Sequence, residues 1–234
     1  MTDVVKTRTG QQAAPRTRRA EKAERTRQQV LGAAADLFER NGYAATTIEA
    51  IAAAADVAVE TVYARFRNKL TLLREILDQS IVGNAHGIDI LALPEVTEIR
   101  KLIDQRVQIE GFARLSRGIL QRSAPAHRIL RSALTVDPAV AEFERSDFER
   151  RRRTQAGYID ILTASGPLPT GLDTHQAAIT YGALANPDTY ATLTTRQGFT
   201  PDQYEDWLRT CLTMLLIGTP TEPQGSVRKA CDRT

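Results

Sequence analysis

Hydrophobic side chains recur every three to four residues along most of this 234-residue chain. That spacing is typical of amphipathic helices, whereas strands alternate apolar and polar residues, a pattern the chain lacks at strand length. We therefore predict an all-α fold. The stretches that fit a helix cover about 18–41, 47–55, 59–66, 69–82, 95–121, 125–134, 138–164, 174–185, 188–197 and 201–217.

Short polar motifs mark where several of these helices begin. The motif TTIE (46–49) has the spacing of a capping box, in which the Thr46 hydroxyl accepts a hydrogen bond from the Glu49 amide. The motif TPDQ (200–203) combines the same spacing with a proline at the first helical position. The dipeptide DP (137–138) likewise predicts a capping side chain followed by a helix-starting proline.

A turn near Asp56 separates the two short helices of the first third. Two short helices, joined by a tight turn and packed on a longer first helix, form a helix-turn-helix module. In the helix 59–66 we expect Val62 and Phe66 to be buried and the other side to be exposed.

Charge is distributed unevenly along the chain. Residues 1–27 hold eight Lys/Arg and three Asp/Glu, a net of +5, and the remainder has a net of −2. A basic end on a slightly acidic body predicts a polyanionic partner, and the alternative is a solvated tail that aids solubility. Residues 1–17 lack helical periodicity, so we predict a disordered basic tail. The basic side chains that could reach phosphates or a minor groove are Arg16, Arg18, Arg19 and Lys22, with plain disorder as the alternative.

Several function classes lack their usual motifs. No apolar run of about 18 residues could span a membrane, and the basic N-terminus lacks the apolar segment of a secretory signal. Cys211 and Cys231 are too few for a disulfide framework, so we predict a reducing, cytoplasmic location. No nucleophile elbow, phosphate loop or HExxH pattern occurs, and His86, His127 and His175 are scattered. We therefore expect a protein that is not an enzyme and uses no metal or cofactor.

The stretch AAADLFERNGYAATTIEAIAAAADVAVETVYARFRNKLTLL keeps the residue order and spacing of a known domain through three helices and two turns. On these positions, residues 26–77 resemble the DNA-binding domain of the TetR/AcrR family of bacterial transcription regulators. Together with the helical pattern, the resemblance implies a disordered basic tail (1–17), a helix-turn-helix domain (18–68), a helical effector-binding and dimerisation domain (69–218) and a flexible tail (219–234).

The chain departs from the common family pattern in the turn, which usually has glycine where Asp56 stands, and at the start of the reading helix. Asp tolerates left-handed backbone better than most non-glycine residues, so the turn is expected to survive at some cost. Ala58 stands where Ser or Thr is usual, which removes a side-chain cap worth about 1 kcal/mol. Glu60 stands where the residue is often small or basic. Its carboxylate can accept from cytosine N4, and the alternative is that it complements the helix dipole. The resemblance implies phosphate contacts from Thr47, Tyr63 and Lys69, with partial core packing as the alternative for Tyr63. The exposed face of the reading helix offers further DNA contacts from Val59, Glu60, Thr61, Ala64 and Arg65.

The C-terminal helices are expected to form a dimer and to enclose an effector. One apolar face of the last helix is too wide for a single neighbour. We predict that it packs on a second copy in a four-helix bundle, and the alternative is that Trp207 belongs to the intramolecular core. The predicted interface residues are Tyr204, Trp207, Leu208, Leu212 and Leu215. The predicted effector-lining residues, with ordinary core as the alternative, are Phe112, Leu115, His127, Phe143, Phe148, Tyr158 and Tyr181. The run ERRRRTQ (149–155) is predicted to form a solvated helix face, with a second anion site as the alternative.

These expectations combine into one function. We predict a ligand-responsive transcriptional regulator, in the simplest form a repressor. It would bind a palindromic double-stranded DNA operator as a homodimer and be released by a small-molecule effector. Two alternatives use the same helices: a DNA-binding protein that needs no effector, and a helical protein-interaction adaptor that has lost DNA binding. The departures at Ala58 and Glu60 keep the adaptor open.

Overall fold

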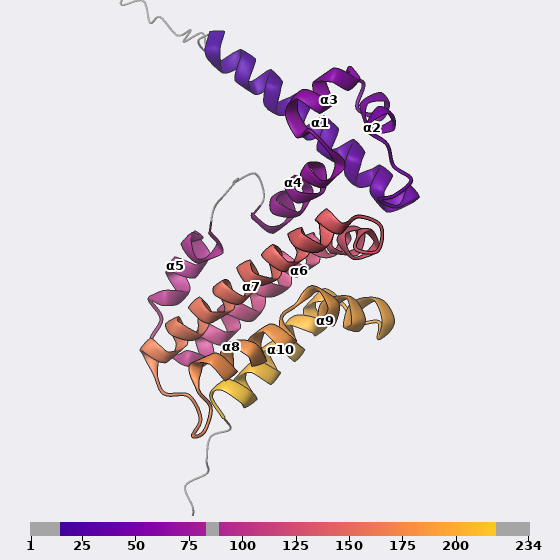
Figure 1. Ribbon diagram of the computed structural model, residues 1–234. Coiled ribbons are helices and arrows are strands. Elements are labelled where there is room, and N and C mark those ends of the chain that lie inside the picture. The colour runs from indigo at the N-terminus through magenta and orange to yellow at the C-terminus, as the bar shows by residue number, and fades with distance from the viewer. Residues whose placement is uncertain (1–14, 83–88, 219–234) are drawn as a thin grey trace, which may run out of the picture. The chain divides into compact units, whose positions relative to one another are not determined.

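Helices account for the regular secondary structure of the part of the chain that the computed structural model describes, residues 15–82 and 89–218 (Figure 1). No strand occurs within those ranges, so the predicted all-α fold is confirmed. No helix within them is both long and apolar enough to cross a membrane. The elements are α1 (Pro15–Asn41), α2 (Ile48–Ala54), α3 (Val59–Phe66), α4 (Lys69–Val82), η1 (Ile90–Ala92), α5 (Pro94–Arg100), α6 (Gln105–Ala133), α7 (Pro138–Ser165), α8 (Thr174–Leu184), α9 (Pro187–Ala191), the π-helix η2 (Thr192–Arg196) and α10 (Pro201–Leu216).

Two of the predicted helix boundaries are wrong. The stretch 95–121 is interrupted, because α5 ends at Arg100 and Asp104 then accepts from the Arg106 amide at the start of α6 (2.8 Å). The predicted break before 125 is absent, and α6 runs through Pro125. An internal proline costs about 3 kcal/mol in a helix. Burial of the flanking side chains Leu120, Ala126, Ile129 and Leu130 offsets that cost here.

The first of two compact units comprises residues up to Leu77 together with Arg128–Ala141. It holds α1, α2, α3 and most of α4, together with the corner between α6 and α7. The predicted tail 1–17 is only partly described: α1 begins at Pro15, and residues 1–14 lie outside the described residues. The core of this unit contains Val30, Leu31, Ala34, Phe38, Ile48, Ile51, Val62, Phe66, Leu72 and Leu73.

The second unit comprises Asp78–His127 and Glu142–Thr234, of which the predicted tail 219–234 lies outside the described residues. Its core joins residues of α5, α6, α7, α8, α9 and α10. Gly111 allows close packing of α6 on α5, because a Cβ there would lie 2.7 Å from Ile99 Cγ1. Gly157 has the same role on α7 against Leu91 of η1. The largest buried side chains of this core include Phe112, Ile109, Ile159, Leu162, Tyr181 and Tyr204.

Candidate nucleic-acid interface

The turn between α2 and α3 has the hydrogen bonds of a Schellman motif. Asp56 adopts a φ of 52°, as predicted for this position. The Asp56 amide donates to the Ala53 carbonyl (3.2 Å) and the Val57 amide to the Ala52 carbonyl (3.0 Å). These bonds satisfy carbonyls at the end of α2 and direct the chain into α3.

The cap of α2 is Thr47, and the predicted cap Thr46 is wrong. The Thr47 side chain accepts from the Ala50 amide at 3.1 Å. Thr46 is buried, and its hydroxyl donates to the carbonyls of Gly42 (2.8 Å) and Leu37 (3.2 Å) at the end of α1. Either threonine could cap by spacing, but only one of them reaches those two carbonyls.

α3 is held by two side chains and exposes the rest of its surface. Val62 and Phe66 have no exposed surface, which confirms their predicted core role. Ala58 precedes the helix and makes no side-chain cap hydrogen bond, as predicted. Val59 is half-buried. The exposed side chains are Glu60, Thr61, Tyr63, Ala64 and Arg65, all of which were predicted to contact DNA.

A short chain of hydrogen bonds connects two of the predicted phosphate-contact residues. The Tyr63 hydroxyl donates to Glu49 Oε1 at 3.4 Å, across the gap between α3 and α2. The Glu49 carboxylate also accepts from its own amide and from Thr47, and these bonds lower its pKa. The structure therefore brings Thr47 and Tyr63 together on one surface, with Glu49 between them. The predicted DNA contacts did not include Glu49, although its place in the TTIE motif marks it as a residue of the first helical turn.

Lys69 connects the start of α4 to the loop before α2. Its ammonium donates to the carbonyls of Tyr43 (2.8 Å) and Ala44 (3.2 Å) and lies 4.7 Å from the centre of the Tyr43 ring. The Tyr43 hydroxyl in turn donates to Asp137 Oδ2 at 3.1 Å, in the corner between α6 and α7. Burial and this carboxylate raise the pKa of Tyr43 well above its ordinary range. An ammonium has three donors, so one N–H of Lys69 is not used by these carbonyls.

An ion-pair cluster under α3 contains an arginine that the predicted site residues omitted. Arg27 of α1 is buried, and its guanidinium donates to Glu75 of α4 (2.8 Å) and to Glu24 (3.0 Å). Glu24 also lies 3.9 Å from the guanidinium of Arg65 at the end of α3. Arg27 lies at helical spacing with Val30 and the rest of the apolar face of α1. That position on the apolar face could have predicted the burial of Arg27 from the sequence.

Residues 30–76 match a family model described as bacterial regulatory proteins, tetR family. The chain carries a tetR-family DNA-binding domain. This match covers α2, α3, the C-terminal part of α1 and more than half of α4, and it includes the turn, the cap and the exposed face of α3 described above. A search of the curated proteins found no match.

Solved structures of transcriptional regulators share the fold of this chain. A putative transcriptional regulator from Saccharomonospora viridis, solved in complex with choline, is 19% identical with a TM-score of 0.58 over 83% of this chain and 96% of that one. NalD from Pseudomonas aeruginosa, the secondary repressor of the MexAB-OprM efflux pump, is 22% identical with a TM-score of 0.59 over 83% and 97%. SmeT in its triclosan complex is 18% identical with a TM-score of 0.62 over 85% and 98%. These likenesses show a shared fold that extends well beyond the matched domain.

The predicted effector-lining residues separate into an interior group and one surface residue. Phe112 stacks on Tyr158 with ring centres 4.4 Å apart, and Tyr158 lies 5.4 Å from Tyr181. Burial raises the pKa of both tyrosines, while a hydrogen bond to Ser116 (2.8 Å) acts in the opposite direction on Tyr181. Leu115 packs at the edge of this core, Phe143 is buried and His127 is half-buried.

Phe148 does not belong with the other predicted lining residues. Half of its surface is exposed, and its ring lies 5.8 Å from the Arg151 guanidinium on the outside of α7. The prediction for Phe148 is therefore corrected to a surface position.

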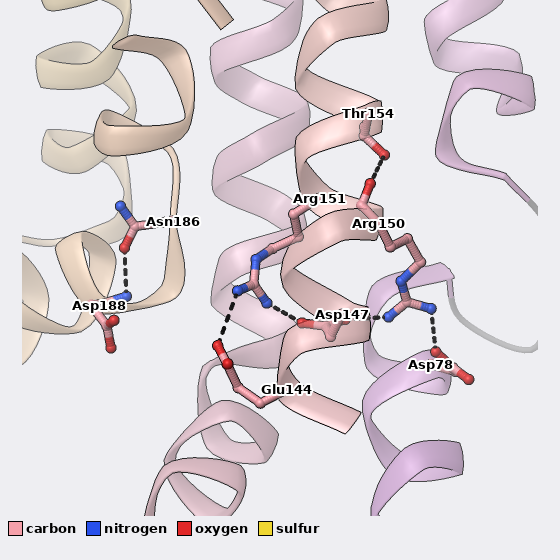
Figure 2. A network of polar contacts seen from close by, with 8 residues as sticks. All are labelled: Asp78, Glu144, Asp147, Arg150, Arg151, Thr154, Asn186 and Asp188. Carbon is pink, nitrogen blue, oxygen red and sulfur yellow. Dashed lines mark hydrogen bonds and ion pairs between the residues drawn. The ribbon is translucent and has the colours of Figure 1, made fainter. Parts of the chain in front are cut away.

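The arginine run at 149–155 is not simply a solvated face. Asp147 has no exposed side-chain surface and accepts from Arg150 (2.5 Å) and from Arg151 (Figure 2). Arg150 also donates to Asp78 of α4 at 2.6 Å. Burial alone would lower the pKa of Arg150, but the two carboxylates outweigh it and raise the pKa. The run thus takes part in an ion-pair network around one buried carboxylate, which spacing alone did not reveal.

Three of the five predicted dimer residues are intramolecular core. Tyr204, Leu208 and Leu212 have no exposed surface, because α10 packs this face on its own unit. Trp207 is half-buried and lies 5.7 Å from the Tyr204 ring, and Leu215 is 49% exposed. A partner could therefore contact only Trp207 and Leu215 of the predicted set.

Proposed function

We propose that this protein is a ligand-responsive transcriptional repressor that binds a palindromic DNA operator as a dimer and is released by a small-molecule effector. The observation that carries the proposal is the build of α3 within a tetR-family domain. Val62 and Phe66 fix the helix, and its exposed face offers small and polar side chains of the kinds that contact base edges in a major groove.

Base reading is assigned to the exposed face of α3. The Thr61 hydroxyl can contact a base or a phosphate, and the Ala64 methyl can pack on a thymine methyl. Glu60 lies in the first turn of α3 and is exposed, so its carboxylate can accept from cytosine N4. Arg65 reaches DNA only by giving up its contact with Glu24 at 3.9 Å, which is weak because both side chains are solvated.

Phosphate contacts are assigned to Thr47, Tyr63 and Lys69. Thr47 lies at the N-terminus of α2, where backbone amides favour an anion. The Tyr63 hydroxyl can rotate from Glu49 to a phosphate oxygen, because a phosphate would repel the carboxylate that now accepts from it. Lys69 can use its remaining N–H without leaving the two carbonyls, so it would present a fixed positive charge.

A dimer interface is assigned to the exposed apolar surface of α8 and α10. Ile179 and Met214 are more than half exposed, and Leu215 is nearly so. Trp207 and Cys211 lie at helical spacing with Met214 and Leu215 on α10. A two-fold partner that covers this surface would place two copies of α3 on the two halves of a palindrome.

The effector is assigned to the interior of the second unit, near α6, α7 and α8. Aromatic faces of Tyr158 and Tyr181 can accept a cationic or aromatic ligand, and Ser116 offers a polar contact. Elsewhere on α6, Ser123 Oγ is buried without a hydrogen-bond partner among the described residues, so it is a polar atom that a ligand could satisfy. The fold neighbours solved with choline and with triclosan support a small organic ligand.

Selection of bound duplexes from random DNA tests the proposal, followed by sedimentation of the protein alone and with the selected site. We expect a palindromic site and a dimer in both samples. Tyr63→Phe should weaken binding to all selected sites alike, whereas Glu60→Gln and Thr61→Ala should change the preferred bases. Enrichment of no sequence, or a monomer on a single half-site, would contradict the proposal.

A release screen with small organic cations and halogenated aromatics tests the effector assignment. We expect at least one compound to lower DNA affinity and to raise the melting temperature of the free protein, as a ligand of the folded state must. Tyr181→Phe should lower the affinity of the protein for that compound without lowering its affinity for DNA when the compound is absent.

A further inference from the structure

The N-terminal part of α1 is a helix whose side chains do not pack on the rest of its unit. Every described side chain from Arg18 to Arg25 is exposed, and the first buried one is Arg27. Figure 1 shows this part of α1 extending past α3. No apolar side chain larger than alanine occurs in this segment, so its exposed surface is almost wholly polar.

Four basic side chains of this segment lie on the same side of the helix. At 3.6 residues per turn, Arg18, Lys22 and Arg25 form one row, and Arg19 lies beside it, so that all four fall within about a third of the circumference. We call these four residues the α1 basic face. None of them forms an ion pair with another residue in the described ranges.

The acidic residues of the segment do not neutralise this face. Glu21 and Glu24 both lie outside the sector that the four basic residues occupy. Glu24 accepts instead from Arg27 and Gln28 (3.0 and 2.8 Å), and these contacts lower its pKa. The α1 basic face therefore retains four unpaired positive charges on a helix that continues into the core of the DNA-binding domain.

We propose that the α1 basic face binds the phosphate backbone of the operator DNA, as a second contact surface beside α3. The proposal rests on the proposed function, since it needs a DNA-bound protein. Of the two targets expected for the basic segment, phosphates or a minor groove, the proposal keeps the phosphates for Arg18, Arg19 and Lys22 and excludes the minor groove for this helix. An α-helix with its side chains is about 10–12 Å wide, whereas the minor groove is about 6 Å wide, so this segment cannot enter that groove.

Backbone binding by this face has a defined energetic signature. Phosphate contacts release condensed counterions, so each one steepens the dependence of log affinity on log salt by about 0.9. They carry no direct sequence information, so they raise affinity for every site alike. Because the segment is already helical in the free chain, binding does not require the ordering that a disordered arm would need.

The test compares salt dependence of binding for the full chain and two charge-matched variants, on a duplex selected with the wild-type protein. The first variant, called the leg variant below, removes the four charges of the α1 basic face: Arg18→Gln, Arg19→Gln, Lys22→Gln and Arg25→Gln. The control variant removes four exposed positive charges from the second unit: Lys101→Gln, Arg145→Gln, Arg153→Gln and Arg196→Gln. Gln is close to Lys and Arg in helix propensity, and circular dichroism verifies that helix content is retained.

We expect the leg variant to lose about 1.8 to 3.6 from the magnitude of the salt slope per protomer, which corresponds to two to four phosphate contacts. The bases preferred in selection should stay the same. The control variant should keep the wild-type slope within about 0.9. A Glu21→Lys variant, which adds a charge at the edge of the α1 basic face, should steepen the slope and does not depend on the leg variant's folding.

Three results would overturn the inference, and they are distinguishable. If the wild-type protein selects no DNA, the proposed function fails and this inference fails with it. If the wild-type protein binds, but the leg variant and Glu21→Lys both keep the wild-type slope, the inference alone fails. A leg variant that changes base preference at an unchanged slope would also overturn it.

Discussion

Arg27 gives the sharpest test of how the DNA-binding domain is held together. Its side chain is 6% exposed and contacts Glu75 through two nitrogens, at 2.8 and 2.7 Å, and Glu24 through a third at 3.0 Å. Removal of one partner from a fully buried ion pair costs about 3–5 kcal/mol. The carboxylates remain partly solvated here, with side-chain exposures of 28% for Glu75 and 51% for Glu24. We therefore expect Arg27→Met to reduce the free energy of unfolding of this unit by about 2–3 kcal/mol.

Urea titration with two probes measures this change. Trp207 is the single tryptophan of the chain and lies in the second unit, so its fluorescence reports that unit, whereas circular dichroism reports the helices of both. With a slope near 2 kcal/mol per molar urea, the dichroism transition of the first unit should move down by about 1 M. The double variant Arg27→Met/Glu75→Met replaces the pair by apolar side chains of similar length and should recover most of the loss. The reasoning is refuted if Arg27→Met lies within about 0.5 kcal/mol of wild type, or if the two substitutions are additive.

Three further predictions follow from single side chains. Because the φ of 52° at Asp56 favours glycine, Asp56→Gly should stabilise the first unit by about 0.5–1 kcal/mol. Asp56→Ala should destabilise it by about 1 kcal/mol, and urea titration measures both changes. Asp147→Ala should lower the free energy of unfolding of the second unit by about 3 kcal/mol, because it leaves two guanidiniums without their buried carboxylate. Urea titration followed by Trp207 fluorescence measures this loss. The control is Glu144→Ala, which removes a partly exposed carboxylate and should cost less than about 1 kcal/mol. Because the pKa of Glu24 is lowered in the folded protein, its carboxylate stabilises the fold at pH values above the ordinary 4.5, and this stabilisation is lost as the pH falls through the lowered pKa. The melting temperatures of wild type and Glu24→Gln should therefore differ at pH 6 and converge near pH 3.

Features that depend on local spacing could be predicted from the sequence. Val62 and Phe66 lie four residues apart on a short helix, and only one side of that helix can be buried. Asp56 could be placed in the left-handed region because a turn of this kind leaves few other positions for it. In both cases the residues that decide the conformation are within one or two turns.

Features that depend on distant partners could not be predicted in this way. Thr46 and Thr47 have equal capping ability, and the choice between them depends on carbonyls at Leu37 and Gly42 that only the folded α1 brings near. The spacing of apolar residues predicted that one face of α10 is buried. Spacing cannot tell whether Leu208 on that face packs on the same chain or on a second copy. Asp147 gave no signal either, because its burial follows from the way α7 packs.

The corner between α6 and α7 has a consequence for exchange of modules between regulators. Asp137 and Arg128 lie far along the chain from α1 but belong to the same compact unit, where they bond Tyr43 (3.1 Å) and Glu39 (2.7 Å). A chimera joined after Leu77 would separate the DNA-binding helices from these two partners, even though that point marks the end of the first continuous stretch of the unit. A recombinant regulator built from this chain should therefore carry residues 128–141 with its DNA-binding helices, since the unit that is inherited together is discontinuous in sequence.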